Sequence, residues 1–95
     1  MSVSISKIVD SSNKELKVGE TNAGFTPPFT IYGTATKNCR ILLWLNKELQ
    51  DAKPASTDDG KWTYKFTPKS NEIDLVAAEA SYTSPTNGTF KTTYE

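Results

Sequence analysis

The segment 57–67 constrains the fold most strongly, because aromatic residues recur at every second position directly after a polar turn. Trp62, Tyr64 and Phe66 alternate with polar or charged residues, and they follow an Asp-Asp-Gly sequence at positions 58–60. Side chains alternate between the two faces of a β-strand, whereas a helix would scatter the three aromatic rings. The segment therefore predicts a strand with one buried face and one solvated face.

Two stretches near the N-terminus are interpreted in the same way. Residues 3–10 alternate until the phase changes at Ile8-Val9, which predicts a first strand that contains a bulge. Residues 11–24 are polar and rich in turn formers, so they predict a loop that contains one short strand pairing. Only Leu16 and Val18 are candidates for anchoring this loop to the body of the domain.

The middle of the chain contains two more strand candidates. Pro27-Pro28 interrupts any regular ladder, and residues 29–36 then alternate strictly, with one face formed by Phe29, Ile31, Gly33 and Ala35. Residues 39–46 have an interior that is apolar on both faces, which is typical of a central strand. From these strands and the aromatic one we expect a core that includes Ile31, Ile41, Leu43, Trp62, Tyr64 and Phe66.

Two later segments are more ambiguous. Asn46-Lys47-Glu48 predicts a hairpin turn, and a weak strand over residues 49–55 follows it, interrupted by Pro54. The long segment 73–82 has two competing registers, and a bulge would permit both: the inward set is either Ile73, Leu75 and Ala77 or Val76, Ala78, Ala80 and Tyr82. A helix is the further alternative for this segment, although it lacks a cap and strand candidates flank it.

The C-terminal residues predict a turn and a closing strand. Ser-Pro-Thr-Asn-Gly at positions 84–88 is a turn sequence, and residues 89–94 alternate with Phe90 and Thr92 on one face. Six to eight short strands separated by turns are typical of an all-β chain that folds as an antiparallel β-sandwich. Because 95 residues suffice for one two-layer core, we expect a single domain over residues 1–95.

Composition narrows the possible partners and compartments. Eleven basic residues balance eleven acidic ones and Arg40 is the only arginine, so we do not expect nucleic acid as a partner. The longest apolar run, residues 41–45, is too short to span a bilayer, so no membrane insertion is expected. Cys39 is the only cysteine, which excludes an internal disulfide, and we expect it to be a small core or strand-edge residue rather than a reactive thiol.

Catalytic and metal chemistry find little support in the sequence. The chain has no histidine, which removes Ser-His-Asp and Cys-His relays and every histidine metal ligand. We therefore expect neither an enzyme nor a cofactor. Asp58 and Asp59 are weak calcium candidates, because calcium takes six or more oxygen ligands and two adjacent acids supply too few. Turn formation is the simpler role for both.

Trp44 carries the sharpest binding hypothesis. If Ile41 and Leu43 face the core, then Leu42 and Trp44 emerge on the opposite face together with Arg40. An apolar patch beside a cation is suited to stacking on a sugar ring or to seating a peptide. The alternative is that a neighbouring strand, the 11–24 loop or an adjacent domain covers Trp44.

Three motifs together resemble the bacterial immunoglobulin-like (Big-type) repeat domains of large secreted and cell-surface adhesins. Ile8-Val9-Asp10-Ser11 is similar to the opening strand of such repeats, and residues 29–35 are similar to their apolar-Gly-Thr-Ala strand. Asp59-Gly60-Lys61-Trp62-Thr63-Tyr64 is similar to their Asp-Gly-X-Trp-X-Tyr strand, and residues 41–45 fall where the family places its third strand. The likeness covers most of the chain, although Lys37-Asn38-Cys39 stands where the family has a Gly-rich turn.

The resemblance implies an immunoglobulin-like sandwich of about seven strands and a non-catalytic structural or adhesion module. Such a module spaces or presents other domains of a bacterial surface or secreted protein, so neighbouring immunoglobulin-like domains are the expected partners, and the module itself is expected to be a monomer. It also implies an extracellular or cell-surface location, and we expect the chain to be excised from a longer protein. The alternative function is a carbohydrate- or protein-binding module, with a host glycan or protein held by the face around Trp44.

Overall fold

A computed structural model gives the fold and describes residues 3–19, 21–51, 54–79 and 88–94. These residues form eight strands and no helix, which confirms the all-β class, with one strand more than the seven expected. The strands are β1 (Ser4–Val9), β2 (Thr21–Asn22), β3 (Phe29–Thr34), β4 (Ile41–Leu45), β5 (Glu48–Leu49), β6 (Lys61–Phe66), β7 (Glu72–Glu79) and β8 (Gly88–Tyr94).

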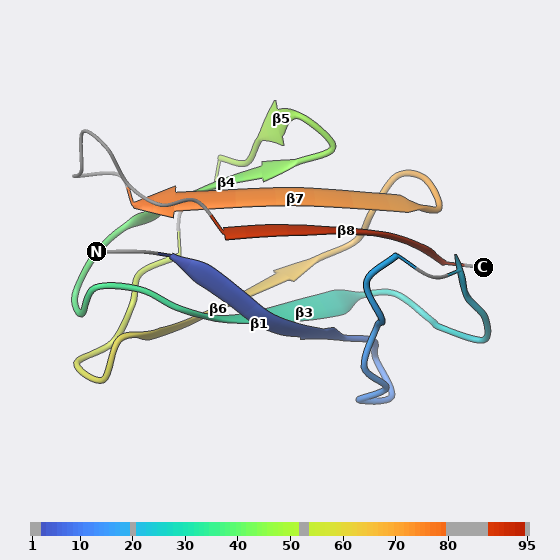
Figure 1. Cartoon of the computed structure of the whole chain (residues 1–95), viewed down its shortest axis with the longest axis horizontal. Coiled ribbons are helices and arrows are strands. Elements are labelled where there is room, and N and C mark those ends of the chain that lie inside the picture. Colours follow the sequence, from blue (N-terminus) through green and yellow to red (C-terminus); the bar gives the residue numbers. More distant parts are fainter. Residues whose placement is uncertain (1–2, 20, 52–53, 80–87, 95) are drawn as a thin grey trace.

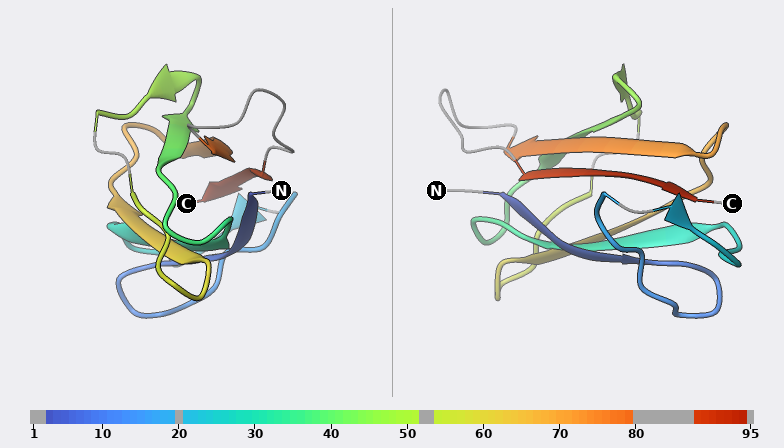
Figure 2. Two further views of the ribbon diagram at one scale, coloured as in Figure 1. Left: turned by 90° about the vertical axis from the view of Figure 1, so that its left-hand side faces the viewer. Right: turned by 45° about the vertical axis from the view of Figure 1, so that its right-hand side comes forward.

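The strands form two sheets that lie one above the other (Figures 1 and 2). The first sheet has the order β1-β3-β6, and the second has the order β2-β8-β7-β4-β5. Neighbouring strands are antiparallel except for β2, which runs parallel to β8. Two sheets with a shared apolar interior are consistent with a β-sandwich. The expectation of a purely antiparallel arrangement is wrong at β2 alone among these pairings.

The core lies between the inner faces of the two sheets. Five of the six residues expected there are at most 7% exposed, and the sixth, Tyr64, is half-buried and packs against them. Both sheets contribute, because the cluster of buried apolar side chains includes Ile8, Phe29, Ile31, Ile41, Leu43, Trp62, Phe66, Ile73, Leu75, Ala77 and Phe90. Phe29 is completely buried and lies edge-on to the Tyr94 ring of β8, with ring centroids 4.9 Å apart. This contact ties the first sheet to the last strand.

Two of the strands expected from the sequence motifs, β3 and β6, are neighbours in the first sheet. Gly33 of β3 pairs directly with Trp62 of β6. A Cβ atom on Gly33 would lie 2.4 Å from the indole ring of Trp62 and 2.5 Å from the carbonyl oxygen of Ser4. The indole Nε1–H donates to the Thr34 carbonyl at 3.1 Å. The glycine therefore makes the space that the tryptophan fills.

Two predictions about strand register can be compared with the structure. The bulge expected in the first strand is present, but the β1–β3 register shifts between Ile5 and Lys7 and not at Ile8-Val9, where the pairing is regular. In β7 the first of the two registers holds, with Ile73, Leu75 and Ala77 completely buried. The helix alternative is wrong over residues 72–79, which form β7. Ala80 and Tyr82 lie outside the described residues, as does most of the turn expected at 84–88.

The loop over residues 11–24 is anchored differently from the expectation. Leu16 is buried as expected, but Val18 is 63% exposed and anchors nothing. Instead, Asn22 of β2 is buried and bonds to both the loop and β8. The expected short strand pairing exists, as the parallel pairing of β2 with β8.

The segment after β4 is less regular than the sequence predicts. The hairpin at residues 46–48 is present, and Asn46 and Lys47 both have positive φ, as a two-residue turn between antiparallel strands requires. The weak strand expected over residues 49–55 is reduced to Glu48 and Leu49 of β5 and an isolated bridge between Ala55 and Arg40. Pro54 belongs to no strand, in keeping with its lack of a backbone N–H that could donate to a neighbouring strand.

Candidate functional site

Trp44 lies on the outer face of the five-stranded sheet. Ile41 and Leu43 of β4 are at most 1% exposed and face the core, so alternation directs Leu42 and Trp44 outward. Both outward residues are half-buried. Across the sheet Trp44 pairs with Val76 of β7 on one side and with Leu49 of β5 on the other. Trp44 is therefore the centre of a short apolar row rather than an isolated ring.

Arg40 stands apart from this row. It precedes β4, is exposed, and its backbone bridges Ala55 outside the sheet. It lies on the Leu42 side of Trp44, four residues away along the chain. Of the three residues assigned to binding from the sequence, Leu42 and Trp44 share the outer face of β4, and Arg40 lies at its margin.

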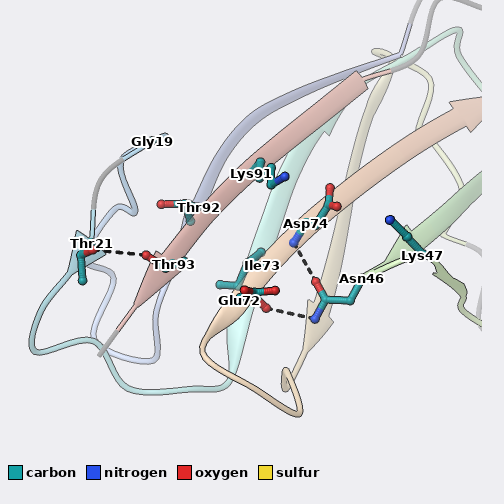
Figure 3. Close-up of a pocket in the computed structure, with 10 residues that line it drawn as sticks. All are labelled: Gly19, Thr21, Asn46, Lys47, Glu72, Ile73, Asp74, Lys91, Thr92 and Thr93. Atoms are coloured by element: carbon teal, nitrogen blue, oxygen red, sulfur yellow. Dashed lines mark hydrogen bonds between the residues drawn. The ribbon is translucent and has the colours of Figure 1, made fainter.

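A hollow of about 640 Å³ opens on the same sheet next to the Trp44 row. Its floor is formed by β7 and β8, one wall by the segment that leads into β2, and the other wall by the β4–β5 turn. Figure 3 shows Asp74 of β7 between Lys91 of β8 and Lys47 of the turn. Hydrogen-bonding side chains therefore line it, among them Thr21, Lys47, Glu72, Asp74, Lys91 and Thr93.

Hydrogen bonds fix the turn side of the hollow. The Asn46 side-chain oxygen accepts from the Asp74 backbone N–H at 2.9 Å, and its Nδ2 donates to the Glu72 carbonyl at 3.0 Å (Figure 3). The Asn46 backbone N–H also donates to the Asp74 carbonyl at 2.8 Å. Three bonds from one residue hold the β4–β5 turn against the end of β7, so this wall is preorganised.

Asn22 fixes the opposite side of the hollow. Its side-chain oxygen accepts from the Lys17 N–H at 2.9 Å, and its Nδ2 lies 2.9 Å from both the Thr92 hydroxyl and the Thr93 carbonyl. The Thr92 hydroxyl in turn donates to the Lys17 carbonyl at 2.7 Å. These bonds replace ladder hydrogen bonds that a two-residue strand cannot make, and they hold Thr21 beside Thr93.

Asp58 and Asp59 are both exposed in the turn before β6. Asp59 accepts from the Thr57 hydroxyl and lies 3.8 Å from the ammonium of Lys61. The Thr57 hydroxyl, followed by backbone donors and Lys61, lowers the pKa of Asp59 below its ordinary 3.8. Gly60, with φ of +75°, closes the turn through its N–H to the Thr57 carbonyl at 3.0 Å. The observed bonds of Asp59 are thus those of a turn former.

Asp10 is a buried carboxylate with a structural role. Burial acts to raise its pKa, but backbone N–H groups of Lys14, Thr26 and Ser12 donate to it, and the Lys14 ammonium adds attraction. The net effect lowers the pKa of Asp10 below its ordinary 3.8. The carboxylate therefore joins β1 to both ends of the 11–24 loop.

A second buried polar cluster lies where β3 ends and β4 begins. The Cys39 N–H donates to the Ser56 hydroxyl at 2.8 Å, and Cys39 is 9% exposed. Glu79, which is 1% exposed, accepts from the Thr36 N–H at 2.8 Å through Oε1. Within the part of the chain that the structure describes, its Oε2 and the Thr36 hydroxyl have no hydrogen-bond partner. This cluster organises loop ends, and one carboxylate supplies no metal centre.

Sequence reasoning did not find the hollow. Glu72, Asp74, Lys91 and Thr93 share one face of β7 and β8 only in the register that the sequence left open. The available signal was the alternation of Glu72 and Asp74 with buried Ile73 and Leu75, continued in Lys91 and Thr93 beside Phe90 and Thr92.

The described residues contain no metal-binding cluster and no membrane-spanning helix. Among the described residues, no three His, Cys, Asp or Glu side chains gather closely enough to hold a metal ion. The same part of the chain contains no helix of the length and apolarity needed to cross a bilayer. Comparison with protein-family models, with curated proteins and with solved structures finds no match for this chain.

Proposed function

We propose that the chain is a non-catalytic immunoglobulin-like module that spaces or presents other domains of a bacterial surface or secreted protein. The strand order supports the immunoglobulin-like assignment. The order β1-β3-β6 is similar to the order of strands A, B and E in that fold, and the order β8-β7-β4 is similar to that of G, F and C. The short β5 takes the place of C′ beside C, and β2 adds an edge to G.

The shared direction of the first and last strands supports the spacer role. Figure 1 shows β1 and β8 running the same way along the long axis, which measures 37 Å against 24 and 22 Å for the others. Gly88 at the start of β8 lies against Ser4 at the start of β1, because a Cβ on Gly88 would be 3.0 Å from the Ser4 Cα. A chain entering through β1 and leaving through β8 therefore passes from one end of the domain to the other.

The chemistry of the described surface supports a non-catalytic role. The sequence contains no histidine, and the carboxylates of Asp10 and Asp59 stabilise a loop and a turn. The Asp10 carboxylate accepts from backbone N–H groups and the Asp59 carboxylate from the Thr57 hydroxyl, so these two acids have roles in local structure. We extend to this module the extracellular or cell-surface location that the family resemblance implies.

A tandem of two copies tests the spacer role. Joining Tyr94 of one copy directly to Val3 of the next leaves the entry and exit strands as the only determinants of orientation. Small-angle X-ray scattering should give a maximum dimension close to twice that of one copy. A pair that folds back to the dimension of a single copy, with both copies folded by circular dichroism, would contradict the proposal.

A further inference from the structure

The outer face of the five-stranded sheet is ordered in rows that change from apolar to polar. The register places Leu49, Trp44, Val76 and Thr89 in one row across β5, β4, β7 and β8. The next rows toward the β4–β5 turn are Asp74 beside Lys91, then Glu72 beside Thr93 and Thr21. From Val76 to Glu72 the face extends about 13 Å along β7, at the usual rise of a strand. An apolar platform and a hydrogen-bonding hollow are therefore continuous.

The apolar end offers an aromatic ring that is partly exposed on the outer face. Trp44 is half-buried, and Leu49 beside it is 46% exposed. Neither residue belongs to the cluster of buried apolar side chains between the sheets. An indole face attracts the C–H surface of a ring ligand and leaves the ligand's edge free for hydrogen bonds. Trp44 is diagonal to Asp74, a separation of about 7–8 Å between such positions, so one ligand can meet both.

The polar end offers donors and acceptors with cancelling charge. Two lysines, Lys47 and Lys91, face two carboxylates, Glu72 and Asp74, and the Thr21 and Thr93 hydroxyls lie beside them. The equal numbers of opposite charges leave the hollow without net charge, so it does not favour an anion over a cation. What remains is a dense set of hydrogen-bonding groups, which suits a ligand that carries many hydroxyls and no charge.

The backbone of this face argues against an extended peptide as occupant. Peptides that add to a sheet do so through unpaired main-chain groups at a strand edge. Here β7 is paired on both sides, with β4 and β8, so this strand presents side chains alone to the hollow. Recognition over β7 must therefore come from side-chain hydrogen bonds, with the Trp44 ring beside them.

We propose that the Trp44 row and the adjoining hollow together bind a neutral oligosaccharide of at least two sugar units. One ring stacks on Trp44, and the next unit lies in the hollow, where Asp74 accepts from its hydroxyls and Lys91 donates to them. The site goes beyond the spacer role and does not depend on it, because it uses only the outer face of one sheet.

Nuclear magnetic resonance titration of the isotope-labelled chain tests this site. The two tryptophans give two indole N–H signals, and the Trp62 signal is an internal control because that ring is 2% exposed and bonded to Thr34. The probes are neutral cello-, malto-, xylo-, manno- and chito-oligosaccharides of two to six units, with a sulfated oligosaccharide as the charged comparison. With at least one neutral probe, the Trp44 indole and the Lys91 and Thr93 amides should shift saturably while the Trp62 indole does not.

Matched variants separate the site from general surface effects. Trp44→Ala and Asp74→Ala should each weaken binding at least about tenfold, and Lys91→Ala should weaken it severalfold. On the outer face of the other sheet, Tyr32→Ala and Lys65→Ala remove an exposed aromatic and an exposed lysine and should leave affinity within about twofold. Asp74→Ala and Lys91→Ala change surface side chains, so they test the site even if Trp44→Ala lowers stability.

Three results would overturn the inference. The first is no saturable shift of the Trp44 indole with any neutral probe. The second is binding that favours the sulfated probe and disappears at high salt, which would assign the face to an anionic ligand. The third is unchanged affinity in Asp74→Ala and Trp44→Ala variants that remain folded.

Discussion

The two sheets of this domain achieve their order by different means. In the three-stranded sheet, β3 and β6 are six-residue strands paired along their full length. Gly33 of β3 lies opposite Trp62 of β6 and leaves the space that the indole ring occupies. In the five-stranded sheet, edge strand β2 has only two residues, and the Asn22 side chain provides the bonds that its backbone lacks. The pair β3 and β6 is thus secured by steric fit, whereas β2 depends on a buried polar side chain.

The strongest test of the steric side is Gly33→Ala. The added methyl would lie 2.4 Å from the Trp62 ring and 2.5 Å from the Ser4 carbonyl oxygen, and the second of these contacts is backbone that cannot rotate away. We expect the free energy of unfolding to fall by about 3 kcal/mol or more. Urea denaturation followed by circular dichroism measures the change.

Trp62→Phe supplies the matched background for that variant. The smaller ring removes part of the clash, so Gly33→Ala should cost at least about 1 kcal/mol less in the Trp62→Phe background than in the wild type. Strictly additive costs would show that glycine is needed at position 33 for a reason other than the space occupied by Trp62.

The polar side of the comparison is tested by Asn22→Ala. Truncation leaves the Lys17 N–H and the Thr93 carbonyl without the partner that Asn22 provides in a buried setting. We expect a loss of about 2 kcal/mol in the free energy of unfolding, and faster hydrogen exchange at the Lys17 amide. Thr93→Val, which removes only a 3.4 Å contact to the Thr21 hydroxyl, is the control and should cost under about 0.5 kcal/mol.

A double variant tells whether Asn22 and Thr92 act as a unit. Both bond to the Lys17 carbonyl and to each other, so Asn22→Ala combined with Thr92→Val should cost less than the two separate costs together. A sum equal to the separate costs would reduce the network to independent contacts and weaken the contrast between the two sheets.

The same contrast explains which parts of the fold could be predicted from the sequence. The faces of β3 and β6 follow from local alternation, since each side chain's direction depends only on its neighbours along the strand. The anchoring role of Asn22 does not follow, because its partner Thr92 is 70 residues away in the chain. Val18 has an apolar side chain that predicts an anchor, yet it is 63% exposed.

The candidate site was predictable only in part for a related reason. Leu42 and Trp44 could be assigned to the outer face because β4 has a clear inner set in Ile41 and Leu43. In β7 both phases are apolar near Val76 and Ala78, so the sequence could not decide which one faces outward. The pairing with β4 and β8 decides it, and only then do Asp74 and Lys91 become neighbours.

Acid should reveal a smaller contribution from the other polar anchor, Asp10. Because the folded-state pKa of Asp10 is lowered, its contribution to stability is fully present well above its ordinary 3.8 and is lost as pH falls through the lowered value. The stability difference between wild type and Asp10→Asn should therefore be larger at pH 6 than at pH 2.5, by urea denaturation. Asp59→Asn, at an exposed turn, should show a smaller change, and an equal difference at both pH values for Asp10→Asn would refute the role assigned to its ionised form.

The outer faces of the two sheets provide the last comparison and the smallest expected effect. Tyr32 on β3 is 37% exposed and has the Lys7 ammonium 5.2 Å from its ring centroid, so the first sheet already covers its aromatic side chain with its own cation. Leu49 on β5 is 46% exposed beside Trp44 and has no such cover in the part of the chain that the structure describes. Tyr32→Thr should lower the free energy of unfolding by about 0.5 kcal/mol through the lost cation–π contact. Leu49→Thr should change it by less than that, since an exposed edge position contributes little packing and threonine suits a strand. If Leu49→Thr instead costs more than about 1 kcal/mol by thermal denaturation, the Trp44 row is part of the folded domain's own packing and not a surface kept for a ligand.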